Sequence, residues 1–307
     1  MSSFRNEQQV SAQQKQFLAS IQQNPLIVDS ITEEDLSTLF KEILEDGFHG
    51  ICFSMYEDGQ QPGDSISEAQ VLRRMKILQP HVKWVRSFSC IEGNEFVPKV
   101  AKDLGMKTLV GAWLSDEKEK NQEEIDALID LANHGLVDVA AVGNEVLYRK
   151  ELSLDELIAY IEEVRAAIPA HIPIGYVDAY YEFSSHPILV EKCDVILANC
   201  YPFWESCPFE YSLAHMQQMY GQALGAGRGK KVIITETGWP SAGENLHAAQ
   251  PSHQNALKYF VNAQVWAKKA GIEMFYFSSF DESWKVGAEG DVGAYWGIWD
   301  KNETLKF

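Results

Sequence analysis

Short runs of apolar residues, many of them β-branched, alternate with helical segments through most of this sequence. Strands that alternate with helices in this way form parallel sheets, and eight of them without a break in composition predict a single (β/α)8 TIM barrel. A doubly wound open sheet is the alternative, but no GxGxxG turn follows the first run. The expected strands cover residues 48–56, 82–90, 108–114, 137–142, 172–177, 194–201, 231–235 and 273–280.

Capping residues indicate where several of the helices begin. Thr32 precedes an apolar helical stripe, and Ser153 with Glu156 forms a capping box before another. We expect Ser65 with Glu68 to cap a third helix in the same way. The first signal precedes all the expected strands, and the other two fall between strands, as the barrel requires.

The first 31 residues differ from the rest of the chain. They are rich in Gln and Ser, and we expect a short polar helix near residues 10–23. The α/β fold is therefore divided into a polar helical extension over 1–31 and one (β/α)8 barrel over 32–307. The extension has no apolar signal-peptide core, which fits an intracellular protein or a mature form.

Charge limits the partners of the protein. The chain has 26 basic and 44 acidic residues and a net charge of −18. Such a chain is repelled by nucleic-acid phosphates and by anionic membranes. No apolar run approaches the length of a membrane span. We expect no nucleic-acid or membrane partner, a neutral substrate, and a monomer.

Cysteines and histidines show no metal-binding spacing. The five cysteines lack CxxC pairs and the eight histidines lack HxxxH or HxH pairs, so we expect neither a metal nor a cofactor. Buried or free thiols are the simplest interpretation. One disulfide stays open, because Cys52 and Cys90 lie at the ends of two expected neighbouring strands.

Two carboxylates lie where a barrel enzyme places its active site, at the carboxyl ends of the strands. Glu145 ends the fourth strand and Glu236 ends the seventh, and these strands face each other across an eight-stranded barrel. Glycoside cleavage needs two carboxylates, one to protonate the leaving oxygen and one to attack the sugar or activate water. Asn144 could then donate to a sugar hydroxyl, and Tyr201 could hydrogen-bond the nucleophile.

The segments Gly143-Asn144-Glu145 and Thr235-Glu236-Thr237-Gly238-Trp239-Pro240 resemble the two active-site motifs of glycoside hydrolase family 17, and the resemblance runs from about residue 48 to 299. It implies a retaining β-1,3-glucanase or β-1,3-glucanosyltransferase, secreted or associated with a cell wall, with Glu145 as acid/base and Glu236 as nucleophile. The segment 281–285 with residue 289 resembles a third family block. That block implies supporting roles for Glu282, Lys285 and Glu289, although a purely structural ion-pair network explains this cluster equally well.

Aromatic residues at or just past strand ends are candidates for stacking on sugar rings. In order of preference, these substrate-binding candidates are Tyr201, Trp239, Tyr180 and Trp204, and Tyr56 is a further candidate. Trp113 could as easily pack in the core, where aromatic residues are more common. Asp178, at the end of the fifth strand, either binds a substrate hydroxyl or caps the next turn.

These observations favour an enzyme that acts on β-1,3-glucan oligosaccharides by double displacement, with its two carboxyl groups about 5–5.5 Å apart. Water as the acceptor makes a glucanase and another glucan makes a transferase, and the sequence leaves both open. A catalytically inactive β-glucan-binding barrel is the alternative, but a binder has no use for two spaced acids. A metal-dependent or Schiff-base barrel lacks both a histidine cluster and a lysine within a strand.

Overall fold

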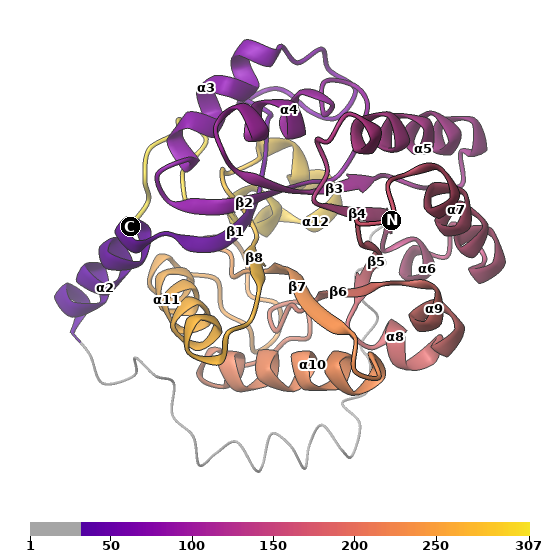
Figure 1. Cartoon of the computed structure of the whole chain (residues 1–307). Helices are drawn as coiled ribbons and strands as arrows, with labels where there is room; N and C mark the ends of the chain where they lie inside the picture. The colour runs from indigo at the N-terminus through magenta and orange to yellow at the C-terminus, as the bar shows by residue number, and fades with distance from the viewer. Residues whose placement is uncertain (1–31) are drawn as a thin grey trace.

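Eight parallel strands close into one barrel in the computed structural model, which describes residues 32–307. Each strand pairs with its neighbours in chain order, and the barrel closes where Gly50 and Ile51 pair with Phe275 and Tyr276 (Figure 1). The predicted (β/α)8 barrel is therefore confirmed. The strands are β1 (Phe48–Cys52), β2 (Val82–Ser87), β3 (Lys107–Ala112), β4 (Val139–Asn144), β5 (Ile174–Ala179), β6 (Val195–Asn199), β7 (Lys231–Thr237) and β8 (Met274–Tyr276).

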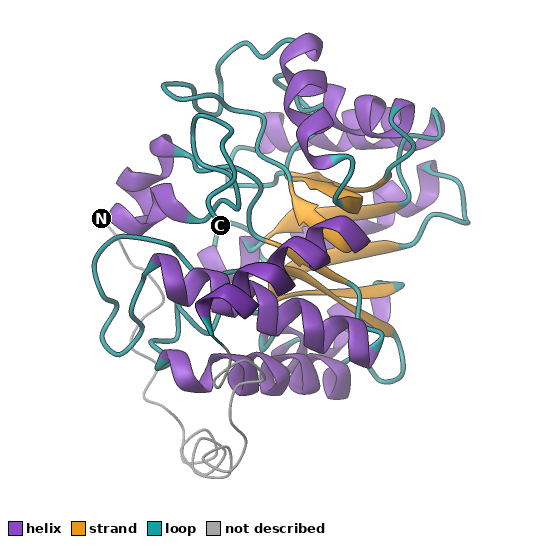
Figure 2. Ribbon diagram, turned by 90° about the vertical axis from the view of Figure 1, so that its left-hand side faces the viewer, coloured by secondary structure: helices purple, strands orange, loops and turns teal. Residues whose placement is uncertain are grey.

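Helices surround the barrel and run alongside the strands, and long loops extend beyond one end of the sheet (Figure 2). The longer ones are α2 (Glu33–Asp46), α3 (Glu68–Leu78), α4 (Phe96–Asp103), α5 (Lys118–Asn133), α7 (Leu154–Ala167), α10 (Ser212–Ala226) and α11 (His253–Ala270). The short ones are α6 (Val146–Arg149), α8 (Glu182–Ser185), α9 (Pro187–Lys192) and α12 (Val286–Glu289). Single 3-10 turns are η1 (Phe209–Tyr211), η2 (Ser283–Lys285) and η3 (Asp291–Tyr295).

Two of the three predicted helix caps are confirmed and one is wrong. The Thr32 side chain accepts from the Asp35 amide, and Ser153 forms a complete capping box with Glu156. Helix α3, in contrast, is capped by Ser67, whose side chain accepts from the Gln70 amide. Glu68 is thus the first residue of this helix rather than its third, so Ser65 lies too far upstream to cap it. The short helix expected near residues 10–23 lies outside the described residues.

Several strands are shorter than the sequence predicted, because the chain leaves the ladder at the carboxyl end of the barrel. After Tyr276 the segment 277–281 runs across the barrel end instead of extending β8. The Phe277 amide still donates to Thr237 of β7, but the next two amides turn to other partners: Ser278 donates to Trp296, and Ser279 donates to Cys52. This segment therefore brings residues that follow β8 to the carboxyl ends of the other strands.

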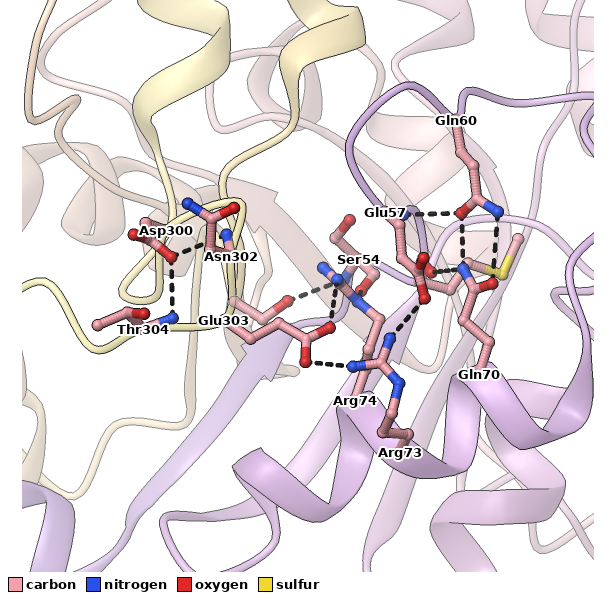
Figure 3. Close-up of polar contacts among 12 residues, drawn as sticks. Ser54, Glu57, Gln60, Gln70, Arg73, Arg74, Asp300, Asn302, Glu303 and Thr304 are labelled. Atoms are coloured by element: carbon pink, nitrogen blue, oxygen red, sulfur yellow. Dashed lines mark hydrogen bonds and ion pairs between the residues drawn. The ribbon is translucent and has the colours of Figure 1, made fainter.

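The carboxyl-terminal residues pack back onto the start of the barrel. The rings of Phe307 and Phe40 of α2 lie 5.5 Å apart at their centroids. Figure 3 shows Glu303 beside Arg74 of α3, whose Nη1 donates to Glu303 Oε1 at 2.9 Å and whose Nε donates to the Ser54 carbonyl at 3.2 Å. The Arg74 guanidinium also lies over the Phe280 ring, with 3.9 Å between its Cζ and the ring centroid.

All five cysteines are buried free thiols. The bridge between Cys52 and Cys90 that the sequence left open is therefore not formed. In the described part of the chain, none of the helices combines the length and the apolar character that a membrane crossing needs.

Candidate active site

Glu145 and Glu236 meet at the carboxyl end of the barrel. Glu236 lies within β7 and is 6% exposed. Glu145 directly follows β4 in the left-handed conformation, with φ 53° and ψ 25°, and starts α6. The side-chain amide of Asn199, the last residue of β6, donates to Oε1 of Glu145 at 3.0 Å and to Oε1 of Glu236 at 3.1 Å. Oε1 of Glu145 and Oε1 of Glu236 are thus separated by no more than the sum of these distances, roughly 6 Å.

A buried arginine connects Glu236 to Asn144. Arg86 of β2 donates from Nη1 to Glu236 Oε1 at 2.6 Å and from Nη2 to Asn144 Oδ1 at 2.8 Å. Because Asn144 Oδ1 accepts this bond, the remaining Nδ2 group of Asn144 is a donor. A carboxylate that faces a guanidinium and further donors is well satisfied as an anion.

Tyr201 completes the contacts of Glu236. Its hydroxyl donates to Glu236 Oε2 at 2.7 Å, as the sequence predicted for this pair. Burial, followed by the charge of Glu236, raises the pKa of the Tyr201 hydroxyl well above its ordinary value. The phenol therefore stays protonated and remains a donor to Glu236 Oε2.

Glu282, Lys285 and Glu289 form an ionic cluster beside these carboxylates. Glu282 Oε2 pairs with Lys285 Nζ at 2.6 Å, and Glu282 Oε1 accepts from the hydroxyl of Ser54 at 2.8 Å. Burial raises the pKa of Glu289 to about 7, with Lys285 opposing and the charges of Glu282, Glu236 and Glu145 reinforcing the rise. The three predicted residues are therefore brought together within electrostatic range of the central pair.

Trp239 does not offer a sugar platform. It is 1% exposed, and its indole N–H donates to the Gln250 carbonyl at 2.9 Å. The ring packs between Phe203, on one strand-end loop, and Tyr259 of α11. The turn after β7 thus carries this side chain behind the barrel wall, into the core, instead of toward the barrel mouth.

The other aromatic candidates differ in exposure. Tyr180 is buried and lies against Glu205, and Tyr201 reaches the site through its hydroxyl. Tyr56 and Trp204 are half-buried and pack on Trp284 and Trp296, respectively, so parts of both rings stay open.

Trp113 is more open than any of the predicted platforms. It follows β3 directly, it is 37% exposed, and the Arg149 guanidinium lies 4.6 Å from its ring centroid. Arg86 pairs in register with Leu109. Arg86 and Leu109 are therefore on the same face of the sheet, and from this face Arg86 reaches Glu236. Because side chains alternate along a strand, Trp113, four residues after Leu109, is on this face too. Trp113 therefore lies at the barrel mouth.

The contacts of Asp178 favour a capping role over binding of a substrate hydroxyl. It is fully buried, and its Oδ1 accepts from the Ala179 amide at 2.7 Å while its Oδ2 accepts from the Tyr176 hydroxyl. Its oxygens are used within the protein, so it caps a turn and does not reach a substrate hydroxyl.

Arg86 and Asn199 are the site residues that sequence reasoning missed. A charged residue inside the apolar strand β2 was a signal for the first, but that strand was expected to end at residue 90, three residues after its observed end at Ser87. Asn199 was overlooked because the sixth strand was expected to end at Tyr201 instead. Within residues 32–307, no three His, Cys, Asp or Glu side chains are arranged to hold a metal ion.

Residues 50–297 match the family model of the BtgE/BtgC glycoside hydrolase domain. The chain belongs to this glycoside hydrolase family. The match includes nearly all of the barrel, from β1 to the segment after η3, and both carboxylates of the site.

Known relatives of this BtgE/BtgC domain agree with the match. The glucan 1,3-β-glucosidase of Schizosaccharomyces pombe is 26% identical over 256 residues, which cover 77% of this chain and 79% of that protein. The crystal structure of a glycoside hydrolase family 17 β-1,3-glucanosyltransferase from Rhizomucor miehei is 29% identical, with a TM-score of 0.75, and the alignment covers 85% of this chain and 96% of that one. An active-site mutant of the R. miehei enzyme in complex with laminaritriose superposes with a TM-score of 0.76, at 28% identity and the same coverage.

Proposed function

We propose that this glycoside hydrolase belongs to family 17 and cleaves or rearranges β-1,3-glucan by a retaining double displacement. The names of the relatives support the substrate, and the two motifs support the family. The contact that carries the mechanism is the Asn199 amide shared by Glu145 and Glu236. It keeps one oxygen of Glu145 within roughly 6 Å of one oxygen of Glu236, and this close approach supports the retaining spacing of about 5–5.5 Å between the carboxyl groups over the inverting range of about 6.5–9.5 Å.

In the first step, Glu236 attacks the anomeric carbon and the glycosidic bond to the leaving sugar breaks. Oε1 of Glu236 is held by Arg86 and Asn199, and Oε2 is held by Tyr201, so the carboxylate stays oriented. Glu145 gives its proton to the leaving oxygen, because an alkoxide of a sugar is a poor leaving group. The free Nδ2 group of Asn144 is placed to donate to a hydroxyl beside the reacting carbon, a contact that strengthens in the transition state.

In the second step, Glu145 takes a proton from the acceptor while the acceptor oxygen replaces Glu236 at the anomeric carbon. Water as the acceptor gives hydrolysis, and a second glucan gives transfer. Both steps invert the anomeric carbon, so the product keeps the β configuration.

Laminarihexaose incubated with the full chain tests both the mechanism and the acceptor. We expect products in the β configuration by early-time NMR; products longer than six units indicate transfer, and only shorter ones indicate hydrolysis. Glu236→Gln should abolish turnover. Glu273→Gln, at the opposite end of the barrel where Glu273 pairs with Lys231, is the matched control and should stay active. An α-configured first product, or no turnover by the wild type, would overturn the proposal.

A further inference from the structure

The turn that presents Glu145 has a strained backbone. Gly143 has φ +87°, and Glu145 adopts a left-handed conformation that is unfavourable for a non-glycine residue. A left-handed residue sets the direction of its own Cα–Cβ bond, so the same backbone choice that strains the turn also aims the Glu145 carboxyl group. Something in the surrounding structure must stabilise this choice.

Tyr176 and Asp178 of β5 lie directly beneath this turn. The Tyr176 hydroxyl accepts from the Leu147 amide at 2.9 Å and donates to Asp178 Oδ2. Asp178 Oδ2 also accepts from the Tyr148 amide at 3.4 Å. Both side chains are fully buried, and a β-carbon added at Gly143 would lie 3.3 Å from Cε2 of Tyr176.

These contacts reach the first amides of α6, the helix that Glu145 begins. The leading N–H groups of a helix have no partner within the helix, and burying them unpaired is costly. The Tyr176 and Asp178 oxygens supply two such partners, while the Glu145 amide donates to the Val177 carbonyl between them at 2.8 Å. Three consecutive residues of β5 therefore hold residues 145, 147 and 148.

We infer that the Tyr176–Asp178 pair is a positioning element for the acid/base Glu145, which acts by fixing the left-handed turn that aims its carboxyl group at the leaving oxygen. The inference rests on the proposed function, because it assumes that Glu145 is the acid/base. Asp178 also lies close enough to Glu145 for the charge of Glu145 to add to burial in raising the pKa of Asp178 well above its ordinary value. Neither residue touches substrate, so both act through Glu145.

A purely structural role would lower activity on all substrates together, whereas a positioning role should depend on the leaving group. Glycosides with a nitrophenol leaving group need no proton, and oligosaccharides do. Tyr176→Phe removes one oxygen and keeps the ring under Gly143. Asp178→Asn keeps the shape but turns an acceptor into a donor next to the Tyr148 amide.

The experiment compares kcat/KM for laminarihexaose with kcat/KM for a nitrophenyl β-laminaribioside. We expect Tyr176→Phe and Asp178→Asn to lose about 10-fold or more on the hexaose, through kcat, and less than about 3-fold on the aryl substrate. Asp194→Asn is the matched control: Asp194 accepts from the Ile174 amide at the opposite end of β5 at 2.9 Å. It should lower the thermal midpoint without changing the ratio of the two rates.

Equal losses on both substrates in Tyr176→Phe and Asp178→Asn would overturn the inference. Glu145→Ala separates this outcome from failure of the proposed function. If Glu145→Ala shows the large leaving-group dependence and the β5 variants do not, only the positioning role is wrong. If Glu145→Ala shows none, Glu145 is not the acid/base, and the proposed function fails with the inference.

Discussion

Arg86 is a buried cation whose two terminal nitrogens bind different partners, Glu236 and Asn144. Its planar fork makes both contacts at once, which a single ammonium group cannot do. Arg86 therefore fixes Glu236, the proposed nucleophile, relative to the side-chain amide of Asn144, the proposed substrate contact. Its guanidinium also stacks on Phe88, with 4.2 Å from its Cζ to the ring centroid.

Arg86→Lys should lower kcat by about 100-fold, the scale of losing one preorganised active-site donor, with a small effect on KM. The reason is that one of the two contacts is lost while charge remains. Steady-state kinetics on laminarihexaose measure this. Arg74→Lys is the control, because Arg74 is equally buried and stacks on Phe280 but pairs with Glu303 outside the site. Similar kinetics for the two lysine variants would contradict the role of Arg86.

The expectation that site residues lie at the carboxyl ends of strands identified Glu145 and Glu236, but it missed a site residue within a strand. Glu145 and Glu236 were predictable because each follows an apolar run. The role of Arg86 was not predictable, because it depends on contact with Glu236, which lies 150 positions away in the chain, and no local sequence pattern reveals that contact. Trp239 also follows a strand, but the packing of its ring against Tyr259 of α11 decides its direction.

At the level of elements, helices and strands were predictable in kind and order but not in their ends. The period of apolar residues identifies a strand, whereas its end depends on where neighbouring carbonyls stop accepting. β8 was expected over residues 273–280, and its ladder stops at Tyr276 because Ser278 bonds to Trp296 instead. That early end is what brings Glu282 and Lys285 to the site.

The carboxyl-terminal segment 300–307 supplies a counterion to a buried arginine (Figure 3). Arg74 pairs with Glu303, and Arg73 contacts Glu303 and Glu57. Glu303→Ala leaves the Arg74 charge buried without a carboxylate counterion, so the free energy of unfolding should fall by about 3 kcal/mol in urea titrations. Adding Arg74→Met should recover most of the loss, because an apolar residue needs no counterion.

Glu57→Ala is the matched control for Glu303→Ala. Glu57 pairs with the same helix through Arg73, but both side chains of that pair are about half exposed. An exposed pair contributes roughly 0–1 kcal/mol, so this variant should unfold almost like the wild type. Equal losses for the two alanine variants would mean that Glu303 does not neutralise Arg74.

For the whole molecule, the alternation of eight strands with helices predicted the barrel, although nothing in β1 or β8 alone indicates that they pair. Closure follows from the count and from the twist of the sheet, and it turns residues from distant strands toward one axis. The same closure buries acidic side chains of a chain with net charge −18. Stability must therefore depend on pH as a property of the fold.

Burial raises the pKa of both Glu124 and Glu289 to about 7, from an ordinary value of 4.5. Between these values, the folded protein holds protons that the unfolded chain has released. Stability from these groups is therefore fully present below pH 4.5 and is lost as pH rises through 7. Glu273, with its pKa lowered to about 2 by a hydrogen bond to His49, acts in the opposite sense and only in acid. Thermal midpoints should thus peak near pH 4.5–5.

Glu124→Gln isolates one of these contributions. Glu124 accepts from the Cys90 amide at 2.8 Å and lies inside the loops after β2 and β3, away from Glu236. Glutamine has the shape of the protonated acid, so the variant should match the wild type near pH 5. By pH 8 it should be more stable, by up to about 3 kcal/mol, because it has no buried charge to solvate. Calorimetry from pH 4 to 8 measures the two curves.

Glu119→Gln, exposed on the same helix, should follow the wild type throughout. Parallel curves for Glu124→Gln and the wild type would show that Glu124 is ionised in the folded protein at pH 5, despite its burial.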